Sequence, residues 1–495
     1  MPPVEPDGQR PERHIKGAEP MLRTLFLHPP SYEGFDGGAG SRYQAKREIR
    51  SFWYPTWLAQ PAALVPGSRL VDAPAAGLTL EDVLPLASQY DLVVMHTGVP
   101  WFKADAGVAE AFKQANPSLS VGMVGAKVAV DPEGSLLAAP ALDFVGREEF
   151  DFTMLELAEG RPLGEIDGLS YRRAEGTIVH NADRAILEDM DRLPYVTDVY
   201  QRDLRVEDYF IGYLKHPYVS LYTGRGCRSQ CTFCLWPQTV GGHRYRVRSV
   251  EHVLGEMEHI RRYWPQVKEV FFDDDTFTDD RGRAQEIARG MNRLGLTWSC
   301  NAKANVPYET LKVLRENGLR LLLVGCESGN DDILKNIKKG VKVDRAREFT
   351  KDCRDLGITI HGTFIVGLPG ETAETIKQTI TFAKDINPHS LQVSIAAPYP
   401  GTSLYRQAKE NGWLPEDEAD LVDERGVQTA ALDYPHLNRT EIFDSADTFY
   451  KKFYFRAGKI AEMSAEMLKD ADLMKRRLRE GIEFISFLRH RQNSA

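Results

Sequence analysis

The chain has 495 residues, a net charge of −9 at pH 7, 42% hydrophobic residues and 27% charged residues. This length exceeds one ordinary core and predicts about two to four domains, with the composition of a soluble globular protein. The negative charge argues against general nucleic-acid binding, which needs a basic surface. No apolar run approaches the roughly 20 residues of a membrane-spanning helix, so we expect a cytoplasmic protein.

The first half of the chain predicts an α/β domain. Residues 1–20 are polar and proline-rich and predict a disordered leader. Within residues 21–150, short apolar segments alternate with helical patterns, which indicates a Rossmann-like parallel sheet. Ligands of such sheets bind beyond the carboxyl ends of the strands. The residues predicted there are His28, Pro29, Pro30, Asp72, Thr97, Gly98 and Gly125.

Residues 31–67 form an unusual stretch that is rich in glycine, arginine and aromatic residues, including Phe52, Trp53, Tyr54 and Trp57. These aromatic side chains either pack a domain interface or contact a substrate. Residues 151–212 are predicted to be a connector, in which DGLSYRRAEGTIVHN indicates a hairpin.

Residues 213–404 predict a partial (β/α)6 barrel of the TIM type. Six strand segments alternate with helical segments: YVSLYTG, KEVFFDD, LTWSCNA, RLLLVGCE, ITIHGTFIVG and LQVSIAAP. The chemistry of such barrels lies at the carboxyl ends of the strands. The helical segment after the first strand has Ser249 as its predicted N-cap.

Residues 405–495 are predicted to be helical and to cap the barrel. This region carries two amphipathic segments, FYKKFYFRAGKIAEM and MKRRLREGIEFISFLRH. As an alternative to capping, Lys451, Lys452, Phe453 and Phe455 would make peripheral contact with a membrane surface, which for a cytoplasmic protein is the inner membrane.

All six cysteines lie after residue 226: Cys227, Cys231, Cys234, Cys300, Cys326 and Cys353. This clustering disfavours a secreted disulfide framework and indicates a metal or redox centre. The first three form a C-x3-C-x2-C array after the first barrel strand, and three thiolates bind three irons of a 4Fe-4S cubane and leave the fourth open. The alternative is a zinc site with His243 as the fourth ligand, in a non-catalytic scaffold.

The array and the later strand ends together resemble the radical S-adenosylmethionine (SAM) superfamily, in the subclass with an N-terminal cobalamin-binding-type domain. The resembling segments are TGRGCRSQCTFCLWP, FFDDDTF, VGCESGNDDILKNIKKG, GTFIVGLPGET and APYPGTSLY. The resemblance implies a cluster on the three cysteines and SAM at the strand ends. The residues that would contact SAM are Asp273, Asp274, Asp275, Glu327, Ser328, Gly367 and Pro369.

The same resemblance implies the chemistry. The open iron chelates SAM, and an electron from a donor such as flavodoxin or ferredoxin yields a 5′-deoxyadenosyl radical that abstracts hydrogen from unactivated carbon. Whether cobalamin binds stays open, because the N-terminal domain lacks D-x-H-x-x-G. It also has VGAKV and GREEF, with Arg147 and Glu148, at turns that relatives keep small. The alternative is a Rossmann-like domain that only covers the barrel or binds substrate.

The aromatic and glycine-rich stretch closely resembles hopanoid-biosynthesis-associated radical SAM proteins of the HpnJ type. This likeness implies ring contraction of the glucosamine headgroup of a bacteriohopanetetrol glycoside, a hopanoid glycolipid, to the cyclitol ether. Cys300 and Cys326 would then donate hydrogen to a product radical, or are simply buried strand residues. His361 is either a proton shuttle or a core histidine, and Lys303 either meets SAM or is a surface lysine. The competing activity is that of a cobalamin-dependent radical SAM methyltransferase.

Overall fold

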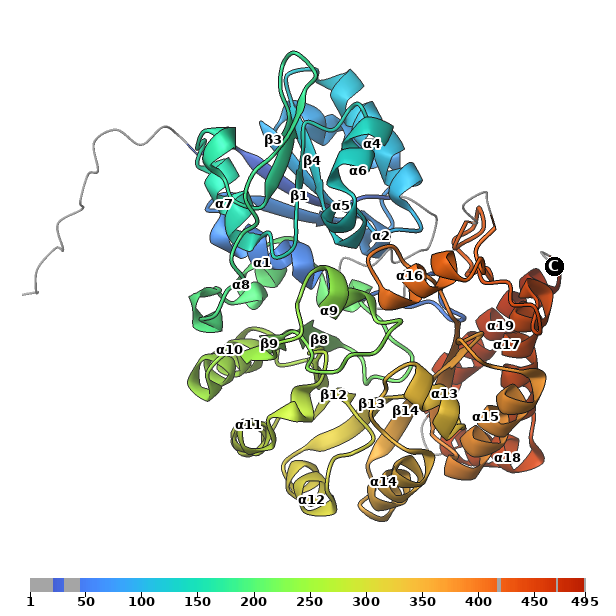
Figure 1. The fold of residues 1–495 in the computed structure, drawn as a ribbon. Coiled ribbons are helices and arrows are strands. Elements are labelled where there is room, and N and C mark those ends of the chain that lie inside the picture. Colours follow the sequence, from blue (N-terminus) through green and yellow to red (C-terminus); the bar gives the residue numbers. More distant parts are fainter. Residues whose placement is uncertain (1–20, 31–44, 416–419, 469–470, 494–495) are drawn as a thin grey trace, which may run out of the picture.

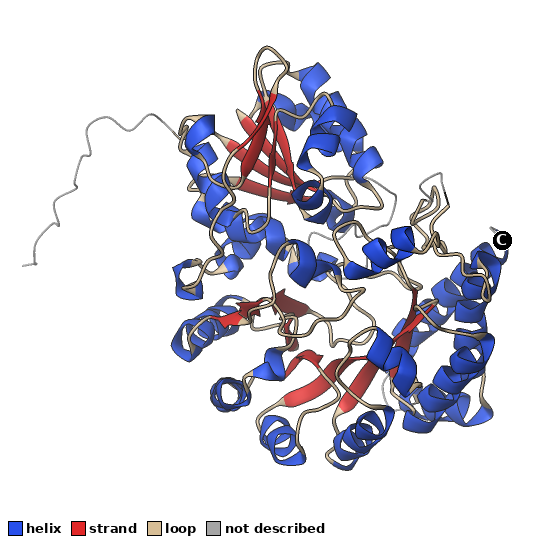
Figure 2. Cartoon of the chain, in the orientation of Figure 1, coloured by secondary structure: helices blue, strands red, loops and turns tan. Residues whose placement is uncertain are grey.

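The computed structural model describes residues 21–30, 45–415, 420–468 and 471–493, so the predicted leader, residues 1–20, lies outside the described residues. An N-terminal α/β domain sits above a half-barrel, and the C-terminal helices line one side of the barrel (Figure 1). Helices lie outside the strands in both parts (Figure 2). This arrangement confirms the predicted α/β class with its Rossmann-like sheet, partial barrel and helical C-terminal region.

The N-terminal sheet has the strand order β2-β1-β3-β4-β5-β6-β7. Its first five strands are parallel, and the predicted hairpin adds two antiparallel strands beside β5. The strands are β1 Thr24–His28, β2 Arg69–Asp72, β3 Leu92–His96, β4 Ser120–Val124, β5 Phe144–Gly146, β6 Leu169–Arg172 and β7 Ile178–His180. The helices are α1 Thr56–Leu64, α2 Ala73–Ala76, α3 Leu80–Val83, α4 Phe102–Ala115, α5 Ala126–Val130, α6 Pro132–Ala138, α7 Asp151–Ala158 and α8 Val196–Asp203.

Alternation along the buried strands gives this sheet two different cores. Leu25 and Leu27 belong to a cluster with α4 on one face. Phe26 and Val94 point to the other face and belong to the cluster that runs on into the barrel. Successive side chains of a strand face opposite sides, so one face of the sheet holds its own helices while the other docks onto the rest of the molecule.

The half-barrel sheet is parallel in the order β15-β14-β13-β12-β11-β8, and it contains all six predicted strands. The strands are β8 Tyr218–Leu221, β11 Glu269–Phe272, β12 Trp298–Ala302, β13 Leu319–Glu327, β14 Thr359–Val366 and β15 Ser390–Ile395. The helices are α9 Leu235–Thr239, α10 Val250–Tyr263, α11 Arg281–Arg293, α12 Tyr308–Glu316, α13 Asp331–Asn336, α14 Val343–Asp355 and α15 Ala373–Ile386. The Ser249 hydroxyl caps α10 as predicted, by accepting the His252 N–H.

The open edge of the half-barrel is capped by side chains. On β15, the N–H groups of Leu391, Val393 and Ile395 donate to the Tyr454 hydroxyl, the Tyr450 hydroxyl and Gln428 Oε1, at 2.9, 2.8 and 2.9 Å. An uncovered edge would offer these groups to another strand. The C-terminal region therefore completes the barrel with side chains in place of further strands.

The C-terminal helices are α16 Ser403–Glu410, α17 Arg439–Tyr454, α18 Ala457–Met467 and α19 Ala471–Asn493. The prediction of a helical tail is wrong for residues 420–438, which form turns and isolated bridges. Gln428, whose side-chain amide bonds both backbone groups of Ile395 on β15, lies in this irregular stretch. Among the residues that the structure describes, no helix is both long and apolar enough to cross a bilayer.

The aromatic residues of the unusual stretch pack between the two parts of the molecule. Phe52, Trp53, Tyr54 and Trp57 are each at most 6% exposed. Tyr54 stacks on Tyr209 and donates to the carbonyl of Tyr218, the first residue of β8. Of the two predicted roles, the structure gives these side chains the interface role.

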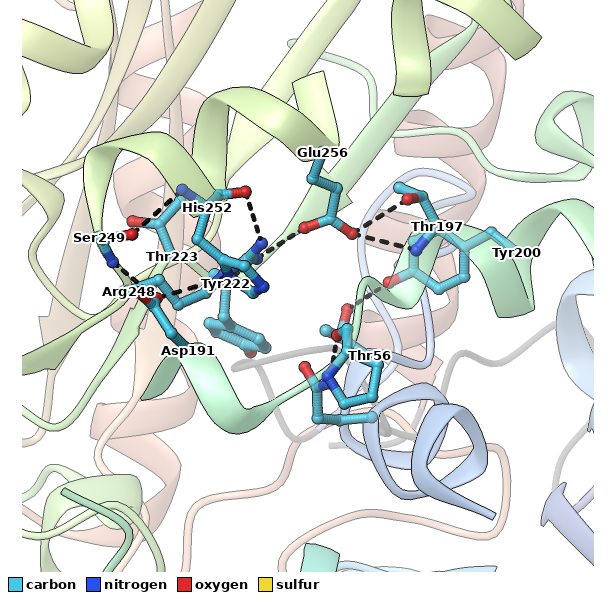
Figure 3. A network of polar contacts seen from close by, with 12 residues as sticks. Thr56, Asp191, Thr197, Tyr200, Tyr222, Thr223, Arg248, Ser249, His252 and Glu256 are labelled. Atoms are coloured by element: carbon cyan, nitrogen blue, oxygen red, sulfur yellow. Dashed lines mark hydrogen bonds and ion pairs between the residues drawn. The ribbon is translucent and has the colours of Figure 1, made fainter. Parts of the chain in front are cut away.

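A buried polar network reinforces the same interface (Figure 3). Arg248 pairs with Glu256 of α10 at 2.6 Å, and Glu256 accepts hydrogen bonds from the backbone and hydroxyl of Thr197 on α8. Also on α8, Tyr200 shares a hydrogen bond with Thr56 of α1. Helices α1 and α8 are thereby fixed to the barrel through satisfied polar groups.

Candidate active site at the cysteine loop

The three array cysteines lie on a loop whose base is closed by a short antiparallel pair. Strand β9, Gly224–Arg225, pairs with β10, Arg246–Val247, directly after β8. Gly226 has φ of +86°, and a Cβ there would lie 2.3 Å from the Arg244 carbonyl oxygen. Only glycine accepts this turn, so the residue before Cys227 is set by the backbone.

The backbone of the loop is held by side chains. Gln238 Nε2 donates to the carbonyl oxygens of Cys231 and Cys234 at 3.2 and 2.7 Å. The exposed His243 places Nδ1 at 3.2 Å from the Cys227 carbonyl and 2.9 Å from that of Ser229. These contacts fix the loop without using the thiols, which leaves three sulfur donors for a cluster.

The zinc alternative finds little support in this geometry. Across the described ranges, no three His, Cys, Asp or Glu side chains form a group suited to one metal ion. A structural zinc ion needs four ligands in a tetrahedron about 2.0–2.3 Å from the metal. His243, the predicted fourth ligand, is exposed and bonds the loop backbone through Nδ1, and within the described residues its side chain is not grouped with the thiols as one zinc ion would need.

The three aspartates after β11 have different surroundings. Asp274 is fully buried and accepts hydrogen bonds from the Thr223 backbone, the Thr223 hydroxyl and the Tyr245 hydroxyl. Burial raises the pKa of Asp274, although Arg283 and these donors oppose the shift. Its carboxylate therefore braces the base of the cysteine loop. Asp273 accepts from Asn301 Nδ2 at 2.9 Å, and Asp275 is half-buried.

Glu327 ends β13 with φ of +59° and carries an ion pair beside the cysteine loop. Lys339 Nζ lies 2.6 Å from Glu327 Oε1. A Cβ on Gly325 would lie 2.3 Å from that oxygen and 2.7 Å from Nζ, so glycine makes room for the pair. Burial opposes the charge of Lys339, but Glu327 and Cys231 outweigh it and raise the pKa of Lys339. This ammonium in turn opposes the burial that raises the pKa of Cys231.

If Cys231 holds the cluster, we expect Lys339→Met to lower the rate of SAM cleavage by about 10–100-fold, the usual cost of losing a group that supports a metal site. The change removes a buried positive charge beside Cys231 and leaves Glu327 unpaired. The measurement is 5′-deoxyadenosine formation by anaerobic protein with reconstituted iron. Lys335→Met, at an exposed position on α13, is the matched control, and an equal effect of both changes would contradict the role of Lys339.

The remaining predicted SAM contacts lie after β13 and β14. Ser328 is fully buried, and its hydroxyl hydrogen-bonds with that of Thr379 at 3.2 Å. After β14, Gly367 has φ of +84° and donates to Glu371 Oε2 at 2.7 Å, and the Leu368 N–H donates to the same oxygen. The loop that holds Pro369 is thus closed on a buried carboxyl that the sequence reasoning did not single out.

Glu371 gives the fold a pH dependence. Burial raises its pKa from 4.5 to about 8, against the two N–H donors. Between these values the folded chain holds a proton that the unfolded chain has released, so stability falls as pH rises through this window. We expect Glu371→Gln to remove this loss, on the order of a few kcal/mol. Thermal melts across the window, with the exposed Glu374→Gln as control, test this, and parallel curves for wild type and Glu371→Gln would refute it.

The sequence also singled out two cysteines, a lysine and a histidine of the barrel. Cys300 is fully buried on β12 and Cys326 is 6% exposed on β13, and burial raises both thiol pKa values, to about 12 for Cys326. Both stay protonated, as a hydrogen donor must be, and their role stays a prediction. Lys303 pairs with Asp279 at 3.2 Å, close enough to Cys231 to influence its charge. His361 lies near the start of β14, away from the strand ends that carry the cysteine loop.

The N-terminal domain lies directly on the cysteine loop. Arg225 forms two hydrogen bonds with Asp151 at the start of α7, at 2.5 and 3.0 Å, and Arg246 pairs with Glu149 at 2.6 Å. Trp57 stacks on Trp236 of α9 with ring centroids 5.4 Å apart. The site therefore lies between the carboxyl ends of the barrel strands and the N-terminal domain.

The carboxyl edge of the N-terminal sheet carries a buried polar chain and a buried histidine. His28 Nδ1 lies 2.9 Å from Asp72, which also accepts from the Tyr209 hydroxyl at 2.8 Å. His96 ends β3 at 1% exposure, and neither of its ring nitrogens has a hydrogen-bond partner within the described residues. Burial and the nearby His28 lower the pKa of His96 to about 3, so the ring is neutral.

Comparison with known proteins places this site. Residues 221–383 match the Radical SAM superfamily. An uncharacterised methyltransferase of Pyrococcus horikoshii is 32% identical over 80% of this chain and 84% of its own length. The anaerobic magnesium-protoporphyrin IX monomethyl ester cyclase of Rubrivivax gelatinosus is 24% identical over 88% of this chain and 77% of its own. The hopanoid C-3 methylase of Methylococcus capsulatus is 29% identical over 49% of this chain and 46% of its own.

Two solved structures share the fold over nearly the whole chain. The cobalamin-dependent SAM radical enzyme OxsB, with aqua-cobalamin and SAM bound, has a TM-score of 0.66 at 16% identity and covers 94% of this chain and 72% of its own. The radical SAM methyltransferase TsrM of Kitasatospora setae, with cobalamin and a 4Fe-4S cluster bound, has a TM-score of 0.66 at 15% identity. It covers 96% of this chain and 100% of its own.

The family match begins at Leu221, the last residue of β8, and covers the cysteine loop and the four strands β11 to β14. Radical SAM proteins use a 4Fe-4S cluster and SAM, and they need a low-potential reductant such as flavodoxin or ferredoxin. With one relative at 32% identity over most of both chains, this chain belongs to the radical SAM superfamily.

Proposed function

We propose that this chain is a cobalamin-dependent radical SAM enzyme, with methyl transfer to an unactivated carbon as its first candidate reaction. One observation carries the proposal: the cysteine loop packs against the carboxyl edge of a Rossmann-like sheet. That edge is where such sheets bind ligands. A cofactor held there would face a cluster held by the loop.

The edge of the sheet fits a bound cofactor. Buried polar groups nearly always have a partner, and the two ring nitrogens of His96 lack one among the described residues. Arg147 stands at a turn that relatives keep small, but its side chain does not use the edge of the sheet. It donates to the Leu169 carbonyl, the Asn181 carbonyl and Asp183 in the β6–β7 hairpin region. In our proposal His96, Thr97 and the Gly125 turn contact cobalamin.

The residues of the chain would divide the work as follows. Cys227, Cys231 and Cys234 hold the cluster, and Asp273 and Asp275 hold the amino group of SAM. The Glu327–Lys339 pair fixes the charge beside Cys231. When bound, the cluster and SAM supply a strong hydrogen-abstracting radical and cobalamin supplies a transferable methyl group. The buried interface around Trp57 keeps water from the reacting groups.

Methyl transfer is supported by the names of the relatives. The Pyrococcus protein, TsrM and the hopanoid C-3 methylase are all named for methyl transfer. Because the last of these is named for a hopanoid, we propose a hopanoid as the substrate class. The aromatic and glycine-rich stretch implies the same class.

A second candidate reaction is ring contraction of the glucosamine headgroup of a bacteriohopanetetrol glycoside, as in proteins of the HpnJ type. It is supported by the aromatic and glycine-rich residues 31–67, whose sequence resembles that of HpnJ-type proteins. The relative that matches 88% of this chain is named a cyclase, so relatives of this chain are not all named for methyl transfer. In this reaction Cys300 or Cys326 would donate the final hydrogen.

One experiment separates the two reactions. The reconstituted protein is incubated anaerobically with SAM, a strong reductant and the glycosylated hopanoid, and the products are read by mass spectrometry. A product heavier by one methyl group supports methyl transfer. A product isomeric with the substrate, formed with 5′-deoxyadenosine, supports ring contraction. Failure of the protein to take up hydroxocobalamin would refute the cobalamin part of the proposal.

A further inference from the structure

A large basic cavity lies at the opposite end of the barrel from the cysteine loop. It has a volume of about 980 Å³ and is lined by residues at the starts of the strands, such as Lys268 before β11, Thr359 of β14 and Ser390 of β15. Of its described lining residues, eight are lysine or arginine and three are acidic. In a chain of net charge −9 this is a local concentration of positive charge.

Part of this positive charge is not neutralised by the protein. Four of the cavity's arginines are paired: Arg320 with Glu269 at 2.8 Å, Arg477 and Arg476 with Glu480 at 2.8 and 3.8 Å, and Arg479 with Glu483 at 3.7 Å. Lys215, Lys268 and Lys475 form no ion pair with any described carboxylate. Burial lowers the pKa of His216, and the neighbouring Arg476, Lys268 and Arg479 lower it further. The cavity therefore has the electrostatic character of an anion site.

An apolar cavity adjoins the basic one. It has a volume of about 320 Å³ and shares Tyr213, His389 and Arg477 with the basic cavity. Its other walls include Ile460 and Met463 of α18 and Phe484 and Ile485 of α19. A space that is basic on one side and apolar on the other matches an amphiphile with an anionic head and a hydrocarbon tail.

The helices around these cavities expose apolar side chains to solvent. On α19, Leu478, Ile482 and Ile485 are 55%, 71% and 44% exposed, and their spacing places them on one helix face. Exposed Lys475 and Arg479 flank this stripe. Helix α19, which carries this stripe, lies beside α17 among the C-terminal helices on one side of the half-barrel (Figure 1).

The sequence placed membrane contact elsewhere, at Lys451, Lys452, Phe453 and Phe455. Phe453 is fully buried, so those residues do not form one surface. A helix with an exposed apolar stripe and flanking basic side chains is the kind that lies in the plane of a membrane interface.

We propose that the α18–α19 face and the two adjoining cavities bind the surface of an anionic lipid bilayer. A lipid phosphate occupies the basic cavity, its hydrocarbon enters the apolar cavity, and the α19 stripe inserts at the interface. The site is separate from the cysteine loop, so the inference holds whether the reaction is methyl transfer or ring contraction.

Flotation of the purified full chain with lipid vesicles tests the proposal. We expect at least about tenfold more binding to vesicles of equimolar phosphatidylcholine and phosphatidylglycerol than to phosphatidylcholine alone, with loss at high salt. Ile482→Asp and the double change Lys475→Glu with Arg479→Glu should each reduce binding at least about tenfold. Leu137→Asp, which changes a 62% exposed leucine of the N-terminal domain, should bind like wild type.

Three outcomes would overturn the proposal. The first is no vesicle binding, or equal binding to both vesicle types. The second is normal binding by the α19 variants, with circular dichroism showing that they are folded. The third is calorimetric binding of inorganic phosphate without vesicle binding, which would make the basic cavity a site for a free anion.

Discussion

Replacing Cys231 with alanine is expected to abolish cluster assembly and with it SAM cleavage. A cluster held by three thiolates loses one of its three protein ligands, and no other thiol on the described loop can take its place. We expect the brown colour to disappear, iron content to fall well below that of wild type, and 5′-deoxyadenosine formation to drop by about 10³-fold or more.

The control is Cys353→Ala, because Cys353 is buried within α14 and lies on no loop of the site. It should keep its iron and colour, with a modest loss of stability from the smaller side chain. If Cys231→Ala bound as much iron as wild type, the assignment of the cluster to this loop would be wrong. A colourless wild-type protein with stoichiometric zinc would support the scaffold alternative instead.

The second large effect is expected from Arg225→Met at the domain interface. Burial opposes the charge of Arg225, but Asp151 and Glu149 outweigh it and raise its pKa, so the guanidinium stays charged. Removing the guanidinium leaves the Asp151 carboxylate, at 4% side-chain exposure, buried without its partner. Such a loss costs about 3–5 kcal/mol. Thermal melting and limited proteolysis between the N-terminal domain and the barrel measure it.

Two further variants make this prediction specific. Arg244→Met removes an arginine from a pair with Glu188 whose side chains are 73% and 58% exposed, and should change stability by at most about 1 kcal/mol. Arg225→Met combined with Asp151→Leu should recover part of the lost stability, because the uncompensated charge is gone. Equal melting temperatures for Arg225→Met and Arg244→Met would show that the buried pair does not hold the interface.

The strands and the place of the cysteine loop after the first barrel strand could be predicted because their signals are local; that this loop holds the cluster stays a prediction. A buried parallel strand is a short apolar run, and the cysteine array follows one such run directly in the sequence. The choice between interface and substrate contact for Trp57 could not be made, since it depends on Trp236 and Arg225 from the other part of the fold.

Other contacts could not be predicted from the sequence either, because they join segments that only the fold brings together. Lys339 follows Cys231 by more than a hundred residues, and only the return of the chain at the end of β13 brings its charge to the thiol. Asp274 stands beside Asp273 and Asp275 in the sequence. The pairing of β9 with β10 brings the hydroxyls of Thr223 and Tyr245, the residues that precede these strands, to the carboxylate of Asp274. Neighbouring residues of one type therefore acquire different roles from their tertiary surroundings.

The side-chain caps on β15 have a consequence for how the chain folds during synthesis. The N–H groups of Leu391, Val393 and Ile395 have their hydrogen-bond acceptors later in the sequence. These acceptors are on Tyr454, Tyr450 and Gln428. Until the ribosome has released that region, the nascent barrel carries an open strand edge of the kind that pairs with other chains. The half-barrel thus becomes a closed folding unit only after translation has passed Tyr454.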